Sequence, residues 1–262
     1  MFPLFFGQQF TDPVKMKSAL LGVFAFCMIS SVIYIINDIR DVEKDRQHPT
    51  KRFRPIASGE VPVPNALGAA AVCFVLSIIF TLLAGSSSAL LLLLLYFVLN
   101  LGYSMGLKNV PLVDVAILTS GFLIRVLYGA ALTGIEVSNW LYMTVTTGAF
   151  FMGLGKRRNE FQRQSGNDTR AVLKLYSYDF LDKNMYVCVA LCDTFYSLWA
   201  MSHANDRMIW TVPVFILILM RYSLDIEGNS DGDPVEVIEH DVFLVGLVLV
   251  YGLVLLGLLY LF

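Results

Sequence analysis

Eight stretches of apolar residues, most of them close to 20 residues long, dominate this sequence. A helix needs about 20 apolar residues to cross the hydrocarbon core of a bilayer. The stretches are too long for the strands of a membrane barrel, and they lack the alternation of apolar and polar residues that such strands show. They lie at residues 18–36, 63–85, 88–106, 110–133, 138–154, 185–204, 208–224 and 242–262. We therefore predict an all-α, polytopic transmembrane helix bundle with eight full spans, in one integral membrane domain over residues 1–262.

The composition excludes most other classes of protein. Of the 262 residues, 56% are apolar and 15% are charged, whereas a soluble domain has about 25% charged residues. This composition excludes a disordered chain, a nucleic-acid-binding domain and a disulfide scaffold. Residues 1–10 are apolar but too short to span a bilayer, and no basic leader precedes them. We therefore expect no signal peptide there, but either an interfacial segment or the end of a shortened first helix.

The basic residues gather on one side of the predicted membrane domain. If each stretch crosses once, 15 of the 19 Lys and Arg residues lie on the side of segments 37–62 and 155–184. The positive-inside rule makes this the cytoplasmic side. All three long loops, including 225–241, then face the cytoplasm, whereas a transporter needs polar groups on both faces. This arrangement favours an enzyme that uses cytoplasmic and membrane-soluble substrates, with its active site facing the cytoplasm.

Acidic residues recur where the first span ends, at Asp38, Asp41 and Asp45. On a continuing helix this spacing places the three carboxylates on a narrow arc of one face. Carboxylates this close repel one another unless a cation lies among them, and Mg²⁺ takes carboxylate oxygens together with substrate phosphates. The next loop, 46–55, adds basic side chains that can bind phosphate oxygens. We predict a Mg²⁺–diphosphate site here; the alternative is a solvated helix end beside a positive-inside loop.

Two ionisable residues, Asp114 and Arg125, lie inside the fourth stretch. Eleven residues on a helix correspond to about 20° in direction and about three turns in depth. Ionisable groups within a membrane usually face a polar cavity or one another. We expect two levels of one cavity wall, with Asp114 near the mouth and Arg125 deep enough to meet a phosphate. The alternative is that each forms a structural pair with another helix.

The acidic segment also carries a family resemblance. The pattern Asn-Asp-x-x-Asp-x-x-x-Asp at 37–45 resembles the signature of the UbiA superfamily of intramembrane prenyltransferases. The continuation HPTKRFRPIASGEVP, at 48–62, is similar to the decaprenyl-phosphate phosphoribosyltransferase branch. The similarity extends to the YSYDFLD run at 176–182 and to Arg221-Tyr222. The second acidic pair, Asp179-x-x-Asp182, departs from the DxxxD pattern common in the superfamily, which counts against a second metal of the usual kind.

The resemblance implies a nine-helix UbiA-like fold and Mg²⁺-dependent transfer of 5-phosphoribose from phosphoribosyl diphosphate to a polyprenyl (decaprenyl) phosphate. It assigns metal-binding or catalytic roles to Asp38, Asp41, Asp45, Lys51, Arg52 and Arg125. It assigns substrate contacts to Asn37, Arg46, Tyr103, Lys108, Asp114, Lys156, Arg157, Glu160, Tyr176, Asp179 and Asp182. Two other functions stay open: prenyl transfer from a prenyl diphosphate to an aromatic acceptor, which needs the same metal site, and non-enzymatic lipid transport. The expected surroundings are the lipid bilayer, and the formation of a homo-oligomer is left open.

Overall fold

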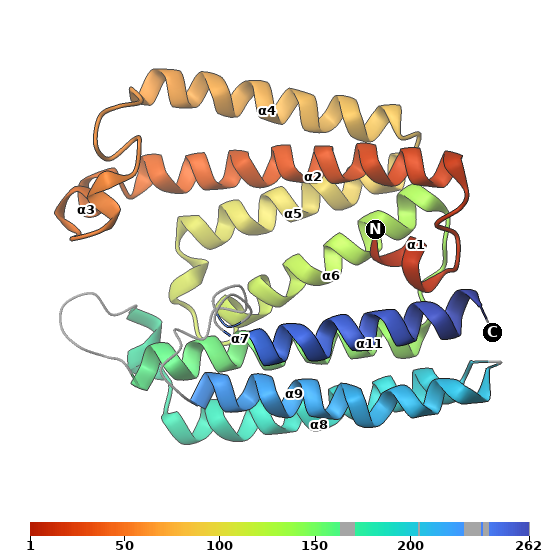
Figure 1. Ribbon diagram of the computed structural model, residues 1–262. Coiled ribbons are helices and arrows are strands. Elements are labelled where there is room, and N and C mark those ends of the chain that lie inside the picture. The colour runs from red at the N-terminus through yellow and green to blue at the C-terminus, as the bar shows by residue number, and fades with distance from the viewer. Residues whose placement is uncertain (163–170, 204, 228–236, 238–240, 262) are drawn as a thin grey trace. The chain divides into compact units, whose positions relative to one another are not determined.

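The structure, a computed structural model, describes residues 1–162, 171–203, 205–227, 237 and 241–261. These residues form helices joined by short loops, with no strand among them (Figure 1). Parts of the predicted loops 155–184 and 225–241 lie outside the described residues. The long helices are α2 (Pro13–Arg40), α4 (Val63–Leu83), α5 (Ser87–Met105), α6 (Val113–Thr133), α7 (Asn139–Gln162), α8 (Tyr178–Met201), α9 (Thr211–Glu227) and α11 (Val242–Tyr260). The short ones are α1 (Phe2–Phe6), α3 (Val42–Gln47), η1 (Lys51–Phe53), η2 (Leu107–Asn109), η3 (Ala171–Leu175) and η4 (Asp206–Trp210).

Each of the eight apolar stretches falls on one of the eight long helices, so the predicted helical fold is confirmed. Among the residues that the structure describes, six segments are long and apolar enough to cross a membrane: α2, α4, α5, α6, η4 with α9, and α11. The other two, α7 and α8, extend their apolar stretches into charged residues, and α7 also carries Thr144, Thr146 and Thr147. Spanning by α7 and α8 therefore stays a prediction.

The first compact unit comprises Met1–Met105 and Ile124–Glu136. Helix α2 begins at Pro13, where Asp12 caps the helix because its Oδ1 accepts hydrogen bonds from two backbone amides. It packs along α4 and α5 around Ala25, Ile29 and Leu93. At Gly22 a Cβ atom would lie only 2.2 Å from Leu132 Cδ1, so glycine allows α2 and the second half of α6 to approach closely.

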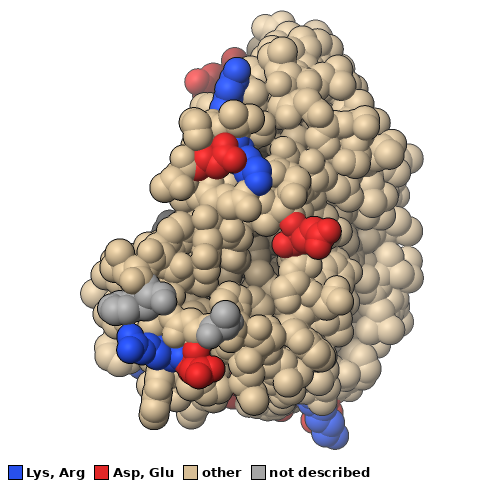
Figure 2. Space-filling view, turned by 90° about the vertical axis from the view of Figure 1, so that its right-hand side faces the viewer, with Lys and Arg blue, Asp and Glu red and all other residues tan. Residues whose placement is uncertain are grey.

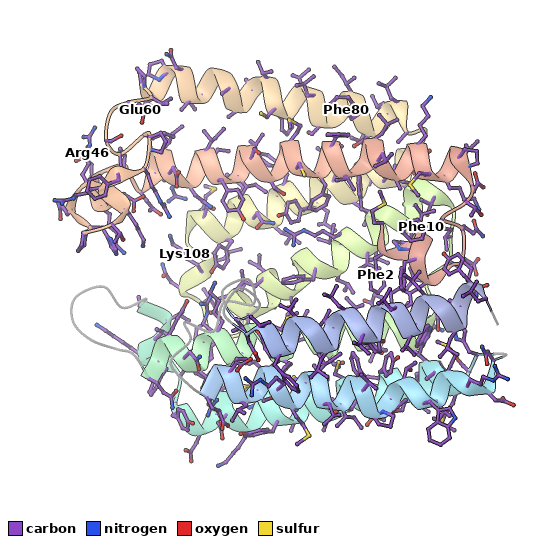
Figure 3. All side chains as sticks on the ribbon, in the orientation of Figure 1. Phe2, Phe10, Arg46, Glu60, Phe80 and Lys108 are labelled. Atoms are coloured by element: carbon purple, nitrogen blue, oxygen red, sulfur yellow. The ribbon has the colours of Figure 1, made fainter. Side chains whose placement is uncertain are left out.

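The two ends of the α2–α4 pair differ in character. Figure 3 labels Arg46 in α3 and Glu60 just before α4 at one end, and Phe10 and Phe80 toward the other. Figure 2 shows the face on the right-hand side of Figure 1, away from α3. Charged side chains form only small separate groups on that face, and most of its surface is uncharged. The polar chemistry of this unit therefore concentrates where α2 ends and α3 begins.

The second unit comprises Gly106–Leu123 and Val137–Phe262. Helices α7 and α8 pack along one another, and α9 packs against α8 and α11. Phe151, Leu181, Met185 and Ile226 form the centre of its core. The boundary between the units falls within α6, so Asp114 belongs to this unit and Arg125 to the first.

Candidate active site

The acidic segment lies at the junction of α2 and α3. Helix α2 ends at Arg40, and Asp41 has φ −93° and ψ 6° before α3 begins at Val42. The expectation of one continuing helix is thus wrong, although the Asp45 amide still donates to the Asp41 carbonyl at 2.7 Å. The break leaves Asp41 half-buried at the junction and buries Asp45, which is 4% exposed.

Arg54 joins two of the three predicted metal ligands. Its Nη1 donates to Asp38 Oδ1 at 2.8 Å and to Asp45 Oδ2 at 2.9 Å. Arg54 is absent from the residues that the resemblance assigned to the site. The available signal was its place in the basic loop that follows the acids, but a loop sequence does not say which of several cations turns back onto the helix.

The other cations of this loop have different surroundings. Arg46 donates to the Ala57 carbonyl at 3.1 Å and pairs with Glu43 at 3.0 Å, so it fastens α3 to the loop. The guanidinium of Arg52 lies 4.8 Å above the Phe53 ring. Lys51 is half-buried on η1, where its backbone amide donates to His48 Nδ1.

One hydrogen bond joins the end of α2 to the end of α5. Ser104, which is buried near the end of α5, donates to Asn37 Oδ1. This hydrogen bond fixes the end of α2 next to the acidic segment. Tyr103 lies half-buried one residue earlier. Lys108 lies half-buried on η2, in the second unit.

The donor chemistry of the acidic segment fits a hard divalent cation. Asp38 and Asp45 already converge on one positive group, and both supply the oxygen ligands that Mg²⁺ prefers. Their convergence on Arg54 is the observation that supports a cation at this position. No group of three or more His, Cys, Asp or Glu within the described residues stands ready to hold a metal ion. The fit therefore rests on the carboxylate chemistry and on the positive charge that these carboxylates already share.

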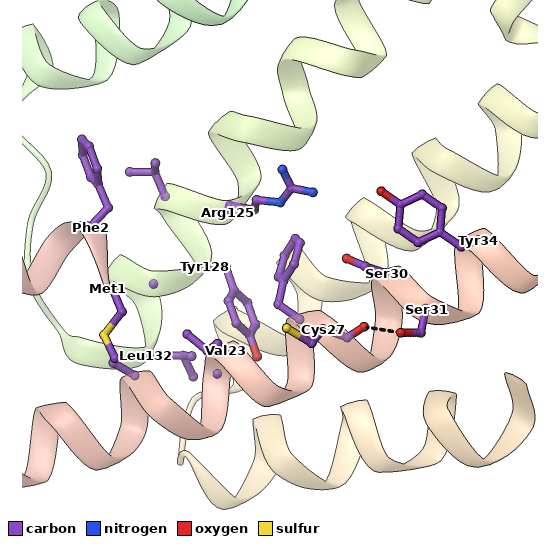
Figure 4. A pocket seen from close by; sticks show the side chains of 15 residues that line it. Met1, Phe2, Val23, Cys27, Ser30, Ser31, Tyr34, Arg125, Tyr128 and Leu132 are labelled. Carbon is purple, nitrogen blue, oxygen red and sulfur yellow. Dashed lines mark hydrogen bonds between the residues drawn. The ribbon is translucent and has the colours of Figure 1, made fainter. Parts of the chain in front are cut away.

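An apolar cavity of about 550 Å³ lies in the same unit, between α1, α2 and the second half of α6. Figure 4 shows Arg125 extending from α6 among Phe2, Val23, Tyr34 and Leu132. Arg125 is the cavity's charged lining residue, and its Nη2 donates to the Tyr96 hydroxyl at 3.2 Å.

Aromatic rings hold the Arg125 side chain in this cavity. Its guanidinium lies 5.4 Å from the Phe26 ring and 5.7 Å from the Tyr96 ring. Cation–π contact of this kind stabilises a charge in apolar surroundings. Arg125, the cation predicted inside the fourth span, therefore lines a cavity in which it can bind an anionic group.

Asp114 lies in a closed network of the second unit. Its Oδ2 accepts from Arg157 Nε at 2.7 Å, and its Oδ1 accepts from the Tyr176 hydroxyl at 2.7 Å. Arg157 also pairs with Glu160 at 2.6 Å. The side chains of Asp114 and Arg157 are both 0% exposed. Asp114 is thus a buried partner of Arg157 on α7, which favours the alternative of a structural pair with another helix.

The Tyr176 hydroxyl completes this network. It accepts the Leu112 backbone amide at 2.6 Å, and Leu112 has a φ of +66° just before α6 begins. Burial, and then the hydrogen bond to Asp114, raise the pKa of Tyr176 to about 12. Asp114, Arg157, Glu160 and Tyr176, all predicted substrate contacts, therefore contact one another. A phosphate contact by Arg157 would require its carboxylate partners to be displaced.

A second cluster surrounds Arg158, whose side chain is 5% exposed. Its Nε lies 2.8 Å from Asp182 Oδ1, and its Nη2 lies 2.6 Å from the Tyr178 hydroxyl. Asp179 behaves differently, because it is 77% exposed and pairs only loosely with Lys183 at 3.5 Å, one turn along α8. Asp182 is thus the partner of a buried cation, whereas Asp179 is a surface residue. Lys156 is half-buried on α7.

Comparison with known proteins identifies the family of the chain. Residues 1–247 match the model of the UbiA prenyltransferase family. The chain is 36% identical to the decaprenyl-phosphate phosphoribosyltransferase of Corynebacterium glutamicum over 81% of this chain and 67% of that protein. It is 36% identical to the enzyme of that name from Mycolicibacterium smegmatis over 81% of this chain and 71% of the relative. With the enzyme of that name from Mycobacterium tuberculosis the identity is 33%, over 88% and 78% of the two chains.

Solved structures agree with this assignment at the level of the fold. A UbiA homologue from Archaeoglobus fulgidus bound to DMAPP and Mg²⁺ superposes with a TM-score of 0.70 at 18% identity, covering 93% of this chain and 86% of the other. The same homologue bound to GPP and Mg²⁺ gives a TM-score of 0.71 at 19% identity, over 92% and 88% of the two chains. With six apolar helices in the described part of its sequence, this chain is an integral membrane protein and belongs to the UbiA prenyltransferase family.

Proposed function

We propose that this protein transfers 5-phosphoribose from phosphoribosyl diphosphate to a polyprenyl phosphate, giving polyprenyl-phosphate 5-phosphoribose and diphosphate. The observation that carries the proposal is the identity of 33% to 36% with decaprenyl-phosphate phosphoribosyltransferases over at least 81% of the chain. The convergence of Asp38 and Asp45 on one positive group supports it, because such a site suits a metal-bound diphosphate.

In this proposal Asp38, Asp41 and Asp45 hold Mg²⁺. When bound, Mg²⁺ supplies positive charge that stabilises the diphosphate as a leaving group. The solved structures of the Archaeoglobus fulgidus homologue contain Mg²⁺ with a prenyl diphosphate, which supports a divalent metal in this fold. Asn37, held by Ser104, keeps the end of α2 in place beside these carboxylates.

The basic residues of the loop neutralise the diphosphate oxygens. Lys51 and Arg52 follow the acidic segment directly and lie in the same unit. Guanidinium and ammonium groups stabilise a departing diphosphate by electrostatic attraction, without any proton transfer.

The proposed reaction is a substitution at C1 of the ribose. A phosphate oxygen of the polyprenyl phosphate forms the new bond to C1, and the bond from C1 to the diphosphate oxygen breaks. A phosphate monoester at neutral pH is already a nucleophile, so the step needs no protein base. The demands on the protein are therefore to bind both substrates, to orient them and to stabilise charge.

The apolar cavity beside Arg125 suits the isoprenoid part of the acceptor. Its walls are apolar, and its charged residue can attract the lipid phosphate. We propose that the active site lies on the cytoplasmic side of a bacterial inner membrane. The distribution of Lys and Arg supports this side, and it gives access to phosphoribosyl diphosphate, which is soluble in water.

The test uses purified protein in detergent with Mg²⁺, radiolabelled phosphoribosyl diphosphate and a polyprenyl phosphate. We expect the label to move into the lipid phase, and the transfer to stop when the metal is removed with EDTA. A parallel reaction offers a labelled prenyl diphosphate with an aromatic acceptor, since the solved homologue binds DMAPP and GPP. Label in the product of that second reaction alone would replace the proposal with aromatic prenyl transfer. Label in neither product would contradict both and favour a lipid carrier.

A further inference from the structure

A single nitrogen atom of Arg54 bridges Asp38 and Asp45 at 2.8 Å and 2.9 Å. The side chains of Arg54, Asp38 and Asp45 are 44%, 28% and 5% exposed. The guanidinium therefore covers the more deeply buried carboxylate from the solvent side. Any other cation that binds these two carboxylates must take the place of this nitrogen.

The Arg54 side chain is 44% exposed, so water can solvate its guanidinium when it leaves the two carboxylates. Asp45 is only 5% exposed and would keep an uncompensated charge, so Arg54 leaves at a small cost only when another cation takes its place. The loop does not depend on the pair, since its own backbone bonds hold it. The Ser58 amide donates to the Arg54 carbonyl at 2.8 Å, and the Val61 amide donates to the Pro55 carbonyl at 2.9 Å.

We propose that Arg54 is a displaceable counter-ion of the acidic site. It pairs with Asp38 and Asp45 in the empty enzyme, yields them to a divalent cation, and then donates to the incoming diphosphate. The last step follows from geometry, because a guanidinium has a planar fork of donors that matches two phosphate oxygens. The identity of the phosphate ligand rests on the proposed function.

The exchange couples the two ligands. A metal that arrives alone must displace Arg54 and leaves the guanidinium without a partner, so its affinity is lowered. A metal that arrives with diphosphate supplies that partner, so each ligand strengthens the binding of the other by the same factor. The enzyme therefore takes up its metal together with the diphosphate, and Arg54 is the residue that joins the two events.

The experiment measures the two affinities separately in the full chain in detergent. Mn²⁺ replaces Mg²⁺ so that electron paramagnetic resonance reports the free metal, and inorganic diphosphate serves as the phosphate ligand. Arg54→Gln should bind Mn²⁺ alone about fivefold more tightly, the equivalent of one lost exposed ion pair. At saturating Mn²⁺ it should bind diphosphate about tenfold more weakly, because a charge-assisted hydrogen bond is lost. The coupling between the two ligands should decrease accordingly.

Two further variants separate this exchange from simpler explanations. Arg40→Gln removes one exposed positive charge next to the acidic segment, and it should change either affinity by less than about twofold. Arg54→Lys keeps the charge but loses the fork, so its diphosphate affinity should lie between those of wild type and Arg54→Gln.

The opposite signs of the two shifts are the decisive result. If Arg54→Gln weakens both ligands together, Arg54 only supports the loop and the proposal is wrong. Unchanged Mn²⁺ affinity would also contradict it, because Arg54 would then not compete with the metal. The measurement does not involve phosphoribosyl transfer. Opposite shifts in a protein that fails the transfer assay would therefore refute the proposed function and keep the exchange.

Discussion

The two units of this protein use the same pairing of arginine with carboxylate in opposite surroundings. In the first unit, Arg54 lies between Asp38 and Asp45 with 44% of its side chain exposed. In the second, Arg157 lies between Asp114 and Glu160 with none of its side chain exposed. Exposed ion pairs contribute little to stability and exchange readily, whereas breaking a buried pair leaves an uncompensated charge.

This difference separates binding groups from supporting groups among residues that look alike in the sequence. The set around Arg54, whose side chain is 44% exposed, is available to a metal and a diphosphate. The buried set fixes the first turn of α6 against α7 through Asp114 and Arg157, and against the segment before α8 through Tyr176. Substitutions in the two sets should therefore affect different measurements, and four predictions test this separation.

The largest effect on stability is expected for Asp114→Ala. It leaves Arg157 buried without its main partner, which should lower the free energy of unfolding by about 3 to 5 kcal/mol. The measurement is thermal or denaturant-induced unfolding of the purified protein in detergent. The double variant Asp114→Ala with Arg157→Met should recover much of the loss, because the orphaned charge is removed as well. Equal instability of the single and double variants would contradict this account.

Asp38→Ala should have the reverse profile. Turnover with Mg²⁺ should fall by about 10²- to 10³-fold, since removing one group that stabilises transition-state charge costs about that much. Stability should change by less than about 1 kcal/mol, because only an exposed ion pair is lost. The checks are the rate of phosphoribosyl transfer and the same unfolding measurement. A near-normal rate would show that this carboxylate does not hold the metal.

Tyr176→Phe should have a smaller effect, with a pH dependence. Losing the hydroxyl leaves the Leu112 amide and Asp114 Oδ1 short of one partner each, at a cost of about 1 to 3 kcal/mol. The folded protein keeps the phenol proton up to a pKa of about 12, whereas the unfolded chain loses it near pH 10. The folded state then binds more protons, so this contribution to stability falls as the pH rises from about 10 to about 12. Unfolding measured across that range should show a decline in wild type that is weaker in Tyr176→Phe, and equal slopes would refute the assignment.

The smallest effect is expected for Lys183→Ala. Lys183 and Asp179 are both 77% exposed and lie one turn apart on α8. Exposed pairs of this spacing contribute about 0.3 to 0.5 kcal/mol, so the unfolding midpoint should barely move. A loss of more than about 1 kcal/mol would show that Asp179 belongs with the buried set.

Much of the fold was predictable from the sequence because the bilayer imposes a length and a polarity on each span. The eight apolar stretches fall on the eight long helices, and the acidic segment falls at the end of α2 as predicted. The interruption of that helix at Asp41 was not predictable in the same way. A break of one residue at a helix end depends on the loop that folds back there, here through Arg46 and Ala57.

The roles of the arginines show where prediction from the sequence stopped. Arg52 and Arg54 are two residues apart in one loop, yet one lies over a phenylalanine ring and the other bridges two carboxylates. Likewise, the sequence predicted a phosphate contact for Arg157 but not its partner in the structure, Asp114, which lies 43 residues earlier in the chain. Local patterns do not contain such pairings.

The sequence by itself determined that this chain crosses a membrane as helices, that its polar groups gather in a few segments, and that one segment has the carboxylate pattern of its family. These features follow from composition and periodicity, which act residue by residue along the chain. Only the tertiary structure decided which cation meets which carboxylate, and which of these pairs water can reach. Pairing and burial depend on residues far apart in sequence, and burial sets whether an ion pair can be exchanged or must be kept.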